Sequence, residues 1–177
     1  MPGFGGDGEA TPMSESVPYE ILPARPEDVP LLLALVRELA EFERLLHEVR
    51  ADEALLERHL FGPTPRAEAA IAWQGRDAVG FALWFHNFST FLGRPGLYLE
   101  DLYVRPRHRG QGLGEALLRH VAACAVERDC GRLEWAVLDW NQRAIDFYRK
   151  LGAVAMDEWT VYRVTGDALP RLAARRD

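Results

Sequence analysis

The sequence has few of the residues that identify metal sites and common hydrolases. Its two cysteines, Cys124 and Cys130, form neither a C-x-x-C pair nor a metal-ligand spacing, and its five histidines include no H-E-x-x-H. Only three serines occur, and none lies in a G-x-S-x-G sequence, which argues against a serine hydrolase of that type. We therefore predict no metal ion, and we interpret the cysteines as buried free thiols in a reducing compartment.

The chain also lacks a basic excess and a long apolar run. Its 177 residues carry a formal net charge of −6, so nucleic acid is not an expected partner. No apolar run approaches about 20 residues, and residues 1–17 lack the basic and apolar stretches of a signal peptide. We expect a cytoplasmic protein that does not bind membranes, with a disordered tail over 1–17 and one domain over 18–177.

Apolar periodicity predicts strands and helices over most of that domain. Strands are expected at 19–22, 69–73, 78–85, 97–104, 133–138, 154–156 and 159–164. Helices are expected at about 26–43, 52–61, 113–125 and 141–151. A mixed run of strands followed by a βαβαβ order predicts a three-layer α/β fold, whose mixed and partly parallel sheet is flanked by helices.

A strand, a glycine loop and a helix follow one another in YLEDLYVRPRHRGQGLGEALL, residues 98–118. The loop is not a P-loop, because no lysine follows the glycines, and Glu115 stands where the dinucleotide fingerprint needs its third glycine. Alternating glycines at a helix start let the backbone approach a ligand, and the free N–H groups favour an anion such as a pyrophosphate. Arg107 or Arg109 would add charge-assisted hydrogen bonds. The glycines alone suit a plain strand-to-helix turn equally well.

The segment RGQGLG, residues 109–114, resembles the acetyl-CoA pyrophosphate loop of the GNAT superfamily of N-acetyltransferases, Q/R-x-x-G-x-G/A. Four further segments resemble its diamine, or spermidine/spermine, acetyltransferase subfamily: LAEFE (39–43), VGFALWF (79–85), LYLEDLYV (97–104) and AVLDWNQRAIDFYRKLGA (136–153). Within the last segment, VLDWNQRA is most similar to the thialysine N-ε-acetyltransferase branch. The resemblance implies the GNAT fold, acetyl-CoA as co-substrate, direct acetyl transfer to a primary amine, and a homodimer.

The resemblance also implies which residues bind the cofactor. Family strands at this position carry a bulge beside which backbone groups hold the pantetheine, and the N–H of Leu102 is a candidate oxyanion donor. Asn141 suits a helix N-cap and, by resemblance, also contacts the cofactor. The full predicted set is Leu102, Tyr103, Val104, Arg109, Gly110, Gln111, Gly112, Leu113, Gly114, Glu115, Asn141, Gln142, Arg143 and Ala144.

Acetyl transfer from a thioester needs a deprotonated amine, a polarised carbonyl and a proton for the leaving thiolate. The resemblance assigns the last task to Tyr148, although a helix tyrosine that merely packs is the alternative. It assigns Glu100 to the amine, either as a base or only as a binding group. In a regular strand Glu100 and Asp101 point to opposite faces, so Asp101 either holds the strand or contacts a second amine.

The remaining predicted substrate residues come from two other segments. Phe42 and Glu43 end the first helix and would form the far wall of the amine site, where the subfamily has tyrosine in place of Phe42. Glu134, Trp135 and Ala136 match a segment that lines the site, though Trp135 would also suit the core. The resemblance implies a thialysine- or lysine-like amino acid, or a diamine or polyamine. The alternatives are acetylation of protein N-termini or of another amine, and a non-catalytic acetyl-CoA sensor.

Overall fold

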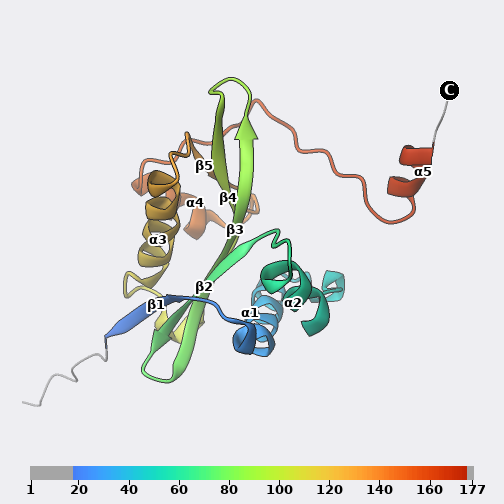
Figure 1. Cartoon of the computed structure of the whole chain (residues 1–177). Coiled ribbons are helices and arrows are strands. Elements are labelled where there is room, and N and C mark those ends of the chain that lie inside the picture. The colour runs from blue at the N-terminus through green and yellow to red at the C-terminus, as the bar shows by residue number, and fades with distance from the viewer. Residues whose placement is uncertain (1–17, 175–177) are drawn as a thin grey trace, which may run out of the picture. The chain divides into compact units, whose positions relative to one another are not determined.

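Five strands pair in chain order in one open sheet, β1-β2-β3-β4-β5, in the computed structural model, which describes residues 18–174 (Figure 1). Their bounds are Tyr19–Pro23 for β1, Glu68–Gln74 for β2, Asp77–Ser89 for β3, Arg94–Val104 for β4 and Leu133–Trp135 for β5. The pairings β1–β2, β2–β3 and β3–β4 are antiparallel, whereas β4–β5 is parallel. The predicted mixed, partly parallel sheet is therefore confirmed, and the tail predicted for residues 1–17 lies outside the described residues.

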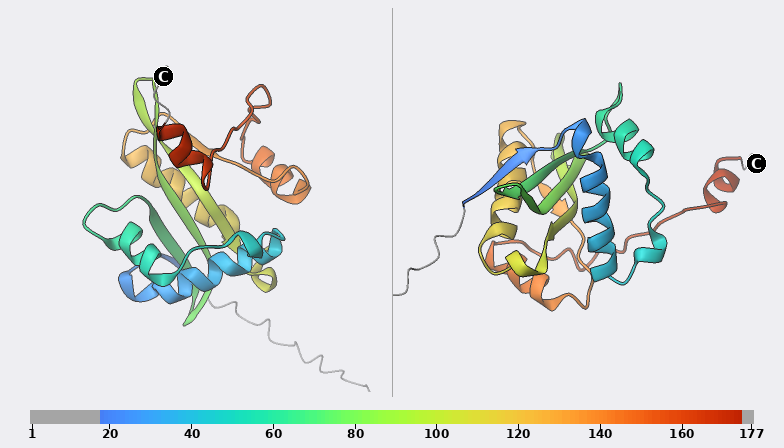
Figure 2. Two further views of the ribbon diagram at one scale, coloured as in Figure 1. Left: turned by 90° about the vertical axis from the view of Figure 1, so that its right-hand side faces the viewer. Right: turned by 90° about the horizontal axis from the view of Figure 1, so that it is seen from below.

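The chain separates into two compact units, Met1–Ala136 and Val137–Asp177. The first contains the sheet with η1 (Pro26–Asp28), α1 (Val29–Phe42), η2 (Leu46–Glu48), α2 (Glu53–Phe61), η3 (Pro106–His108) and α3 (Leu113–Glu127). In Figure 2, α1 and α3 lie on opposite sides of the sheet, which gives this unit the predicted three layers. The Asp52 carboxylate caps α2 by accepting a hydrogen bond of 2.8 Å from the Leu55 N–H.

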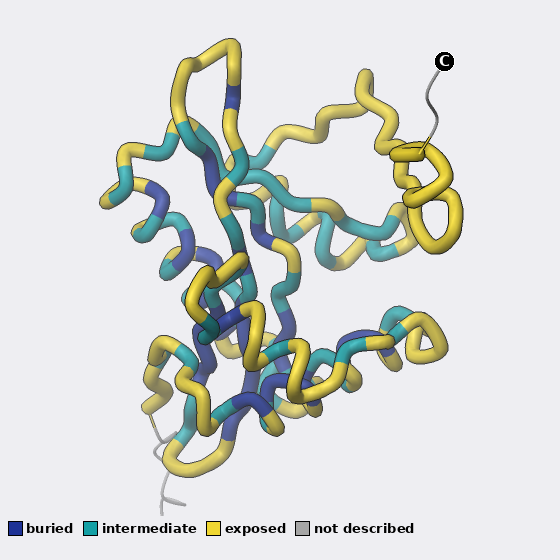
Figure 3. The backbone as a smooth tube through the Cα atoms, turned by 45° about the vertical axis from the view of Figure 1, so that its right-hand side comes forward, coloured by how far each residue is buried: buried dark blue, intermediate teal, exposed yellow. Residues whose placement is uncertain are grey.

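The core of the first unit lies between the sheet and these helices (Figure 3). Leu32, Leu35 and Leu39 of α1 pack with Ile71 and Phe81 of the sheet, and the apolar periodicity predicted a helix over this segment. Burying each such side chain contributes roughly 1.5–3 kcal/mol to folding. This packing fixes α1 against β3, and so it fixes the end of α1 relative to the sheet.

The second unit contains α4 (Gln142–Lys150) and α5 (Ala168–Ala174). The Asn141 side chain caps α4 by accepting a hydrogen bond of 3.3 Å from the Ala144 N–H. Gly152, at φ +88°, follows the end of this helix, where the Ala153 N–H donates to the Tyr148 carbonyl. The predicted helix with its asparagine cap is confirmed.

The strands predicted at 154–156 and 159–164 are wrong. Neither segment pairs with a strand among the described residues, and the side chains of Val161 and Tyr162 are 84% and 91% exposed. Apolar alternation gives a segment strand propensity, but a strand forms only where another strand supplies its ladder partners. The strand predicted to reach residue 138 likewise ends at Trp135.

None of the helices among residues 18–174 is long and apolar enough to cross a membrane.

Candidate active site

Glu100 forms a bulge in β4. Asp101 lies opposite Leu83 of β3, and Leu99 lies opposite Trp84, so Glu100 has no partner of its own across the ladder. An extra residue of this kind bends the strand and redirects the neighbouring side chains. The bulge implied by the resemblance is therefore present. The strict alternation that we expected for Glu100 and Asp101 does not apply here, because the bulge interrupts the two-residue period.

The other edge of β4 loses its partner at the same place. The parallel ladder between β4 and β5 consists of three pairs and ends at Leu99–Trp135. Beyond this pair, β5 supplies no ladder partner to Leu102, Tyr103 or Val104. These three residues are the ones whose backbone groups we predicted to hold a ligand. Backbone N–H and C=O groups need partners, and a ligand lying along this edge of β4 would supply them.

Three carboxylates influence one another beside the bulge. Burial, together with the smaller effects of the negative charges of Glu100 and Glu43, raises the pKa of Asp101 to about 7. Burial also raises the pKa of Glu43. Glu100 itself is exposed. The structure thus brings together Glu43 from the end of α1 with Glu100 and Asp101 from β4, as the predicted amine site requires, and it gives them unequal environments.

Phe42, also at the end of α1, contacts the start of the glycine loop. The guanidinium carbon of Arg109 lies 4.4 Å from the centre of the Phe42 ring and 5.5 Å from that of Tyr103. Arg109 Nε donates a hydrogen bond of 2.7 Å to the Val104 carbonyl. The predicted wall of the amine site and the predicted cofactor loop are therefore in direct contact through this arginine.

Arg105 and Glu38 hold the same region together, and sequence reasoning did not identify this pair as part of the site. Arg105 donates to both carboxylate oxygens of Glu38, at 2.9 and 2.7 Å, and to the Ala78 carbonyl at 2.7 Å. The pKa of Tyr103 is raised, first by burial and then by the charge of Glu38. No short motif identifies an ion pair between residues this far apart in the chain.

The glycine loop leaves space for a ligand at the start of α3. Gly110 and Gly112 have φ angles of +80° and +79°, and a Cβ atom built at either position would meet nothing within 4 Å. Gly112 is the N-cap residue of α3 and provides no side-chain cap. The first N–H groups of a helix have no partner within the helix, and they favour an anion. This geometry fits a pyrophosphate bound by main-chain groups.

The other predicted residues of this loop differ in what their side chains do. The Leu113 side chain is buried in the core, so only its main chain can face a ligand. Glu115 pairs with Arg119 at 2.7 Å, and Gln111 donates to the Arg107 carbonyl at 3.5 Å. Gly114 has only the Val104 side chain near its missing Cβ, at 3.9 Å. The loop therefore presents mainly backbone.

Glu134 is already paired within the first unit. Asn87 donates to its carboxylate at 2.7 Å, and Arg132 lies 2.9 Å from the same oxygen. These contacts join β3 to β5 next to the Tyr98–Glu134 register pair. Trp135 is half-buried and Ala136 is exposed. The role in substrate binding that we predicted for these three residues stays a prediction. In the structure, the Glu134 carboxylate binds Asn87 and Arg132.

The remaining predicted residues belong to the second unit. Tyr148 is half-buried on α4, with its ring centre 5.2 Å from that of Phe147. Gln142 donates to Asp146 at 2.7 Å, Arg143 is exposed, and Ala144 is half-buried next to the Asn141 cap. The predicted catalytic role of Tyr148, and the cofactor contacts predicted for residues 141–144, stay predictions.

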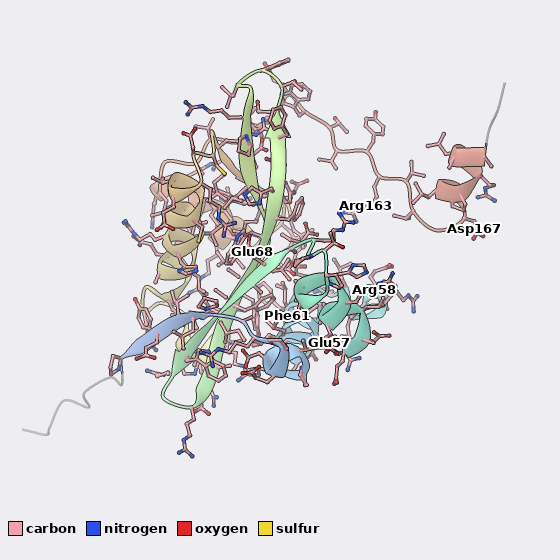
Figure 4. All side chains as sticks on the ribbon, viewed as in Figure 1. Glu57, Arg58, Phe61, Glu68, Arg163 and Asp167 are labelled. Atoms are coloured by element: carbon pink, nitrogen blue, oxygen red, sulfur yellow. The ribbon has the colours of Figure 1, made fainter. Side chains whose placement is uncertain are left out.

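A separate surface cavity of about 300 Å³ lies against α2 and is lined by residues that include Glu57, Arg58 and Phe61 (Figure 4). It involves neither the β4 bulge nor the glycine loop, so we do not assign it to the reaction. Among residues 18–174, no group of three or more histidine, cysteine, aspartate or glutamate side chains is arranged to hold a metal ion.

The chain is similar to known proteins over most of its length. The acetyltransferase (GNAT) family profile matches residues 32–153. A thialysine N-epsilon-acetyltransferase of Bos taurus is 40% identical over 163 residues, covering 86% of this chain and 95% of the relative. An L-ornithine N5-acetyltransferase of Arabidopsis thaliana is 34% identical, covering 91% and 90%. The solved structure of an integron cassette protein from the V. cholerae mobile metagenome aligns with a TM-score of 0.74 at 27% identity, covering 89% and 98%.

Proposed function

Because the chain belongs to the acetyltransferase (GNAT) family, we propose that it transfers the acetyl group of acetyl-CoA directly to a primary amine of a small cationic substrate. The family match and the relatives support an N-acetyltransferase that acts on amines. The β4 bulge is the observation that supports acetyl transfer to a small cationic amine. At Glu100 the strand loses its β5 partner and gathers three carboxylates, next to the glycine loop.

The first unit has the groups that a coenzyme A thioester needs. Main-chain N–H groups at Gly110, Gly112 and the start of α3 would hold the pyrophosphate, because the glycines leave open space there. Backbone groups of Leu102, Tyr103 and Val104 would hold the pantetheine arm along the edge of β4 that β5 leaves unpaired. The Leu102 N–H is our candidate for polarising the thioester carbonyl. The bound thioester supplies the acetyl group.

The carboxylates would select and orient a cationic amine. An alkylammonium has a pKa near ~10, so it arrives charged and must lose a proton before its nitrogen can attack. Glu100, exposed beside the bulge, binds the ammonium group and accepts that proton directly or through a water molecule. Asp101 and Glu43 supply further negative charge for the same substrate. Phe42 supplies an apolar wall beside them, without the hydroxyl group of a tyrosine.

Tyr148 would complete the transfer. The amine nitrogen forms a bond to the carbonyl carbon while the carbon–sulfur bond breaks, and Tyr148 donates its phenolic proton to the departing thiolate. After the bond forms, the nitrogen carries a positive charge and loses its second proton to the tyrosinate, directly or through water, which restores the Tyr148 phenol. The proton taken by Glu100 leaves to solvent, so each turnover gives the amide, the free thiol and one released proton, and no acyl-enzyme is required.

Relatives support an amino acid with a side-chain amine as the substrate. The relatives from cattle and Arabidopsis are named for thialysine and L-ornithine. Each of these compounds carries an α-carboxylate and α-ammonium group in addition to the acetylated amine. A diamine or polyamine remains within the proposal, because a human relative at 30% identity is named spermidine/spermine N(1)-acetyltransferase-like protein 1.

We also propose that the enzyme is a cytoplasmic homodimer. The dimer is supported by the resemblance to the diamine acetyltransferases. Large exposed apolar side chains in the second unit, among them Trp159, Val161 and Tyr162, are suited to burial against another surface. Light scattering after size-exclusion chromatography gives the mass directly, and a mass near 20 kDa would contradict the dimer.

The experiment that tests the function is release of coenzyme A thiol from acetyl-CoA in the presence of single amines. The panel is thialysine, lysine, ornithine, spermidine, putrescine and a short peptide with a free N-terminus. We expect turnover with the amino acids or diamines and none with the peptide. Turnover with the peptide alone would favour an N-terminal acetyltransferase, and cofactor binding without release for any amine would favour a sensor.

A further inference from the structure

Arg109 is held by three contacts within the first unit. Its Nε donates to the Val104 carbonyl at 2.7 Å, and its guanidinium lies over Phe42 at 4.4 Å and over Tyr103 at 5.5 Å. We had expected Arg109 to pair with the pyrophosphate. Its Nε donor and its planar face are engaged by the end of β4 and the end of α1. Arg107, by contrast, is exposed, and its Nε is bonded only to the adjacent His108 among the described contacts.

The partners of Arg109 are themselves fixed. Tyr103 is 5% exposed, and its ring packs against that of Phe81 with centres 6.5 Å apart. Arg105, two residues further along the chain, is held by the Glu38 carboxylate one turn before Phe42 on α1. The Arg109 guanidinium contacts the buried Tyr103 ring and the half-exposed Phe42 ring, and so it connects the end of α1 to the start of the glycine loop.

We infer that Arg109 is a positioning residue that couples the amine side of the site to the cofactor side. Phe42 precedes Glu43, which belongs to the carboxylate cluster, whereas Gly110 follows Arg109 and begins the main-chain anion site. When the Phe42 ring is in place, the Arg109 guanidinium holds the loop in its anion-binding conformation. Occupation of either half of the site thus favours occupation of the other. This inference rests on the proposed function.

Only arginine meets both requirements of this position. A guanidinium donates one directed hydrogen bond while its flat face stacks on aromatic rings, whereas a lysine ammonium is a point charge and cannot do both. A cation over an aromatic ring within about 6 Å contributes energies that correspond to changes of about 3- to 10-fold in an equilibrium constant. A change of that size is measurable by titration calorimetry.

The test is a double-mutant cycle on coenzyme A affinity, with Phe42→Leu, Arg109→Lys and the combined variant. We expect Phe42→Leu to weaken coenzyme A binding about 3- to 10-fold, although Phe42 lies on the amine side. We expect Arg109→Lys to weaken it by a similar factor, and the combined variant to be little worse than either, because both changes remove one interaction. Phe42→Tyr keeps a ring under the guanidinium and should keep the wild-type affinity for coenzyme A.

Controls separate coupling from damage to the fold. Arg76→Lys, in the exposed β2–β3 turn, should change neither affinity nor melting temperature. In wild-type protein, a saturating amine should increase the affinity for coenzyme A. In Phe42→Leu, measured well below its melting temperature, the amine should no longer increase that affinity. If Phe42→Leu has a lower melting temperature but the amine still increases its coenzyme A affinity fully, Phe42 has a structural role only, and the inference is overturned.

Two further results would also overturn it. In one, Arg109→Lys weakens coenzyme A binding strongly while Phe42→Leu has no effect, which would make Arg109 a direct phosphate ligand. In the other, the loss of coenzyme A affinity in the combined variant equals the product of the two single losses, which would show that Phe42 and Arg109 act independently. Failure of wild-type protein to bind coenzyme A at all would instead contradict the proposed function, so the two failures are distinguishable.

Discussion

Leu99 of β4 and Trp135 of β5 form the last pair of the parallel ladder, and the next residue of β4 is the bulged Glu100. The place where the sheet opens on one side is therefore also the place where it is distorted on the other. The inserted residue bends β4 and redirects its neighbouring side chains at the point where β5 supplies no further partner. A β-sheet usually satisfies its own backbone groups, so this interruption, with a carboxylate cluster beside it, is where we propose that the ligand binds.

Replacement of Glu100 by glutamine should affect the two substrates unequally. The amide keeps the shape of the side chain but removes the charge that binds an ammonium group and the base that accepts its proton. We expect KM for the amine to rise about 10-fold or more, with KM for acetyl-CoA changed less than 2-fold, because a hydrogen bond to a charged group contributes roughly 1.5–3 kcal/mol. Steady-state kinetics with each substrate varied in turn measures both constants.

Equal increases in the two KM values for Glu100→Gln would argue against a role in amine binding and point to a disturbed bulge. Glu20→Gln on β1 is a matched control, because that carboxylate is exposed on another strand, and it should leave both constants unchanged.

Asp101 should make stability and amine binding depend on pH in the neutral range. Its pKa is about 7 in the folded protein and near its ordinary value of 3.8 in the unfolded chain. Between pH 3.8 and 7 the folded state therefore holds a proton that the unfolded state has lost. The contribution of Asp101 to the free energy of unfolding falls as pH rises from about 4 to 7 and is constant above that. Between pH 5 and 7 the loss is on the order of 2–3 kcal/mol.

Asp101→Asn tests this directly. The variant should lose that slope, so the difference in free energy of unfolding between the two proteins, measured with urea at a series of pH values, isolates Asp101. In wild-type protein, KM for the amine should fall as pH rises through about 7, because Asp101 then carries the charge that attracts the ammonium group. A wild-type profile that persists unchanged in Asp101→Asn would assign the titration to another group.

The sequence predicted the fold well where local patterns determine it. Glycine at positions 110 and 112 predicted a loop whose backbone is open to a ligand, and Asn141 predicted a helix cap. The sequence did not predict the structure where one inserted residue interrupts the two-residue alternation of a strand, or where a strand needs a partner strand to form. Nothing about Glu100 itself shows that it is inserted, so only the resemblance indicated the bulge. Residues 159–164 have strand propensity without a ladder partner among the described residues.

The candidate site was predicted to a similar extent. The carboxylates and glycines were identified by residue type and resemblance, and the structure brings Glu43, Glu100 and Asp101 together. The direction of the Arg109 side chain was not predictable, because a flexible side chain beside an anion loop can point to the ligand or to the protein. The contact with Phe42 joins segments far apart in the chain, and spacing carries no signal for it.

Tyr148→Phe should separate catalysis from cofactor binding. Loss of the phenolic proton leaves the thiolate without its acid, and general acid catalysis typically contributes 10²- to 10⁴-fold. We expect kcat to fall at least about 100-fold, with coenzyme A affinity within about 2-fold of wild type. Phe147→Leu, which alters the neighbouring ring on α4 and keeps the hydroxyl, is the comparison variant. Unchanged turnover in Tyr148→Phe would remove Tyr148 from the mechanism.

Arg44 is strained and its replacement by glycine should stabilise the protein. Arg44 follows the end of α1 with φ +63°, and the Leu45 N–H donates to the Ala40 carbonyl at 2.7 Å across the turn. Helices that end in this way usually have glycine at this position, because a Cβ costs about 1 kcal/mol in the left-handed region. Against this, glycine makes the unfolded chain more flexible, so we expect a net gain of about 0.5 kcal/mol in the free energy of unfolding. Arg44→Ala removes the same side chain but keeps the Cβ, and therefore should not stabilise. If both variants were equally stable in urea denaturation, the effect would come from loss of the arginine charge next to Glu43 and not from the backbone angle.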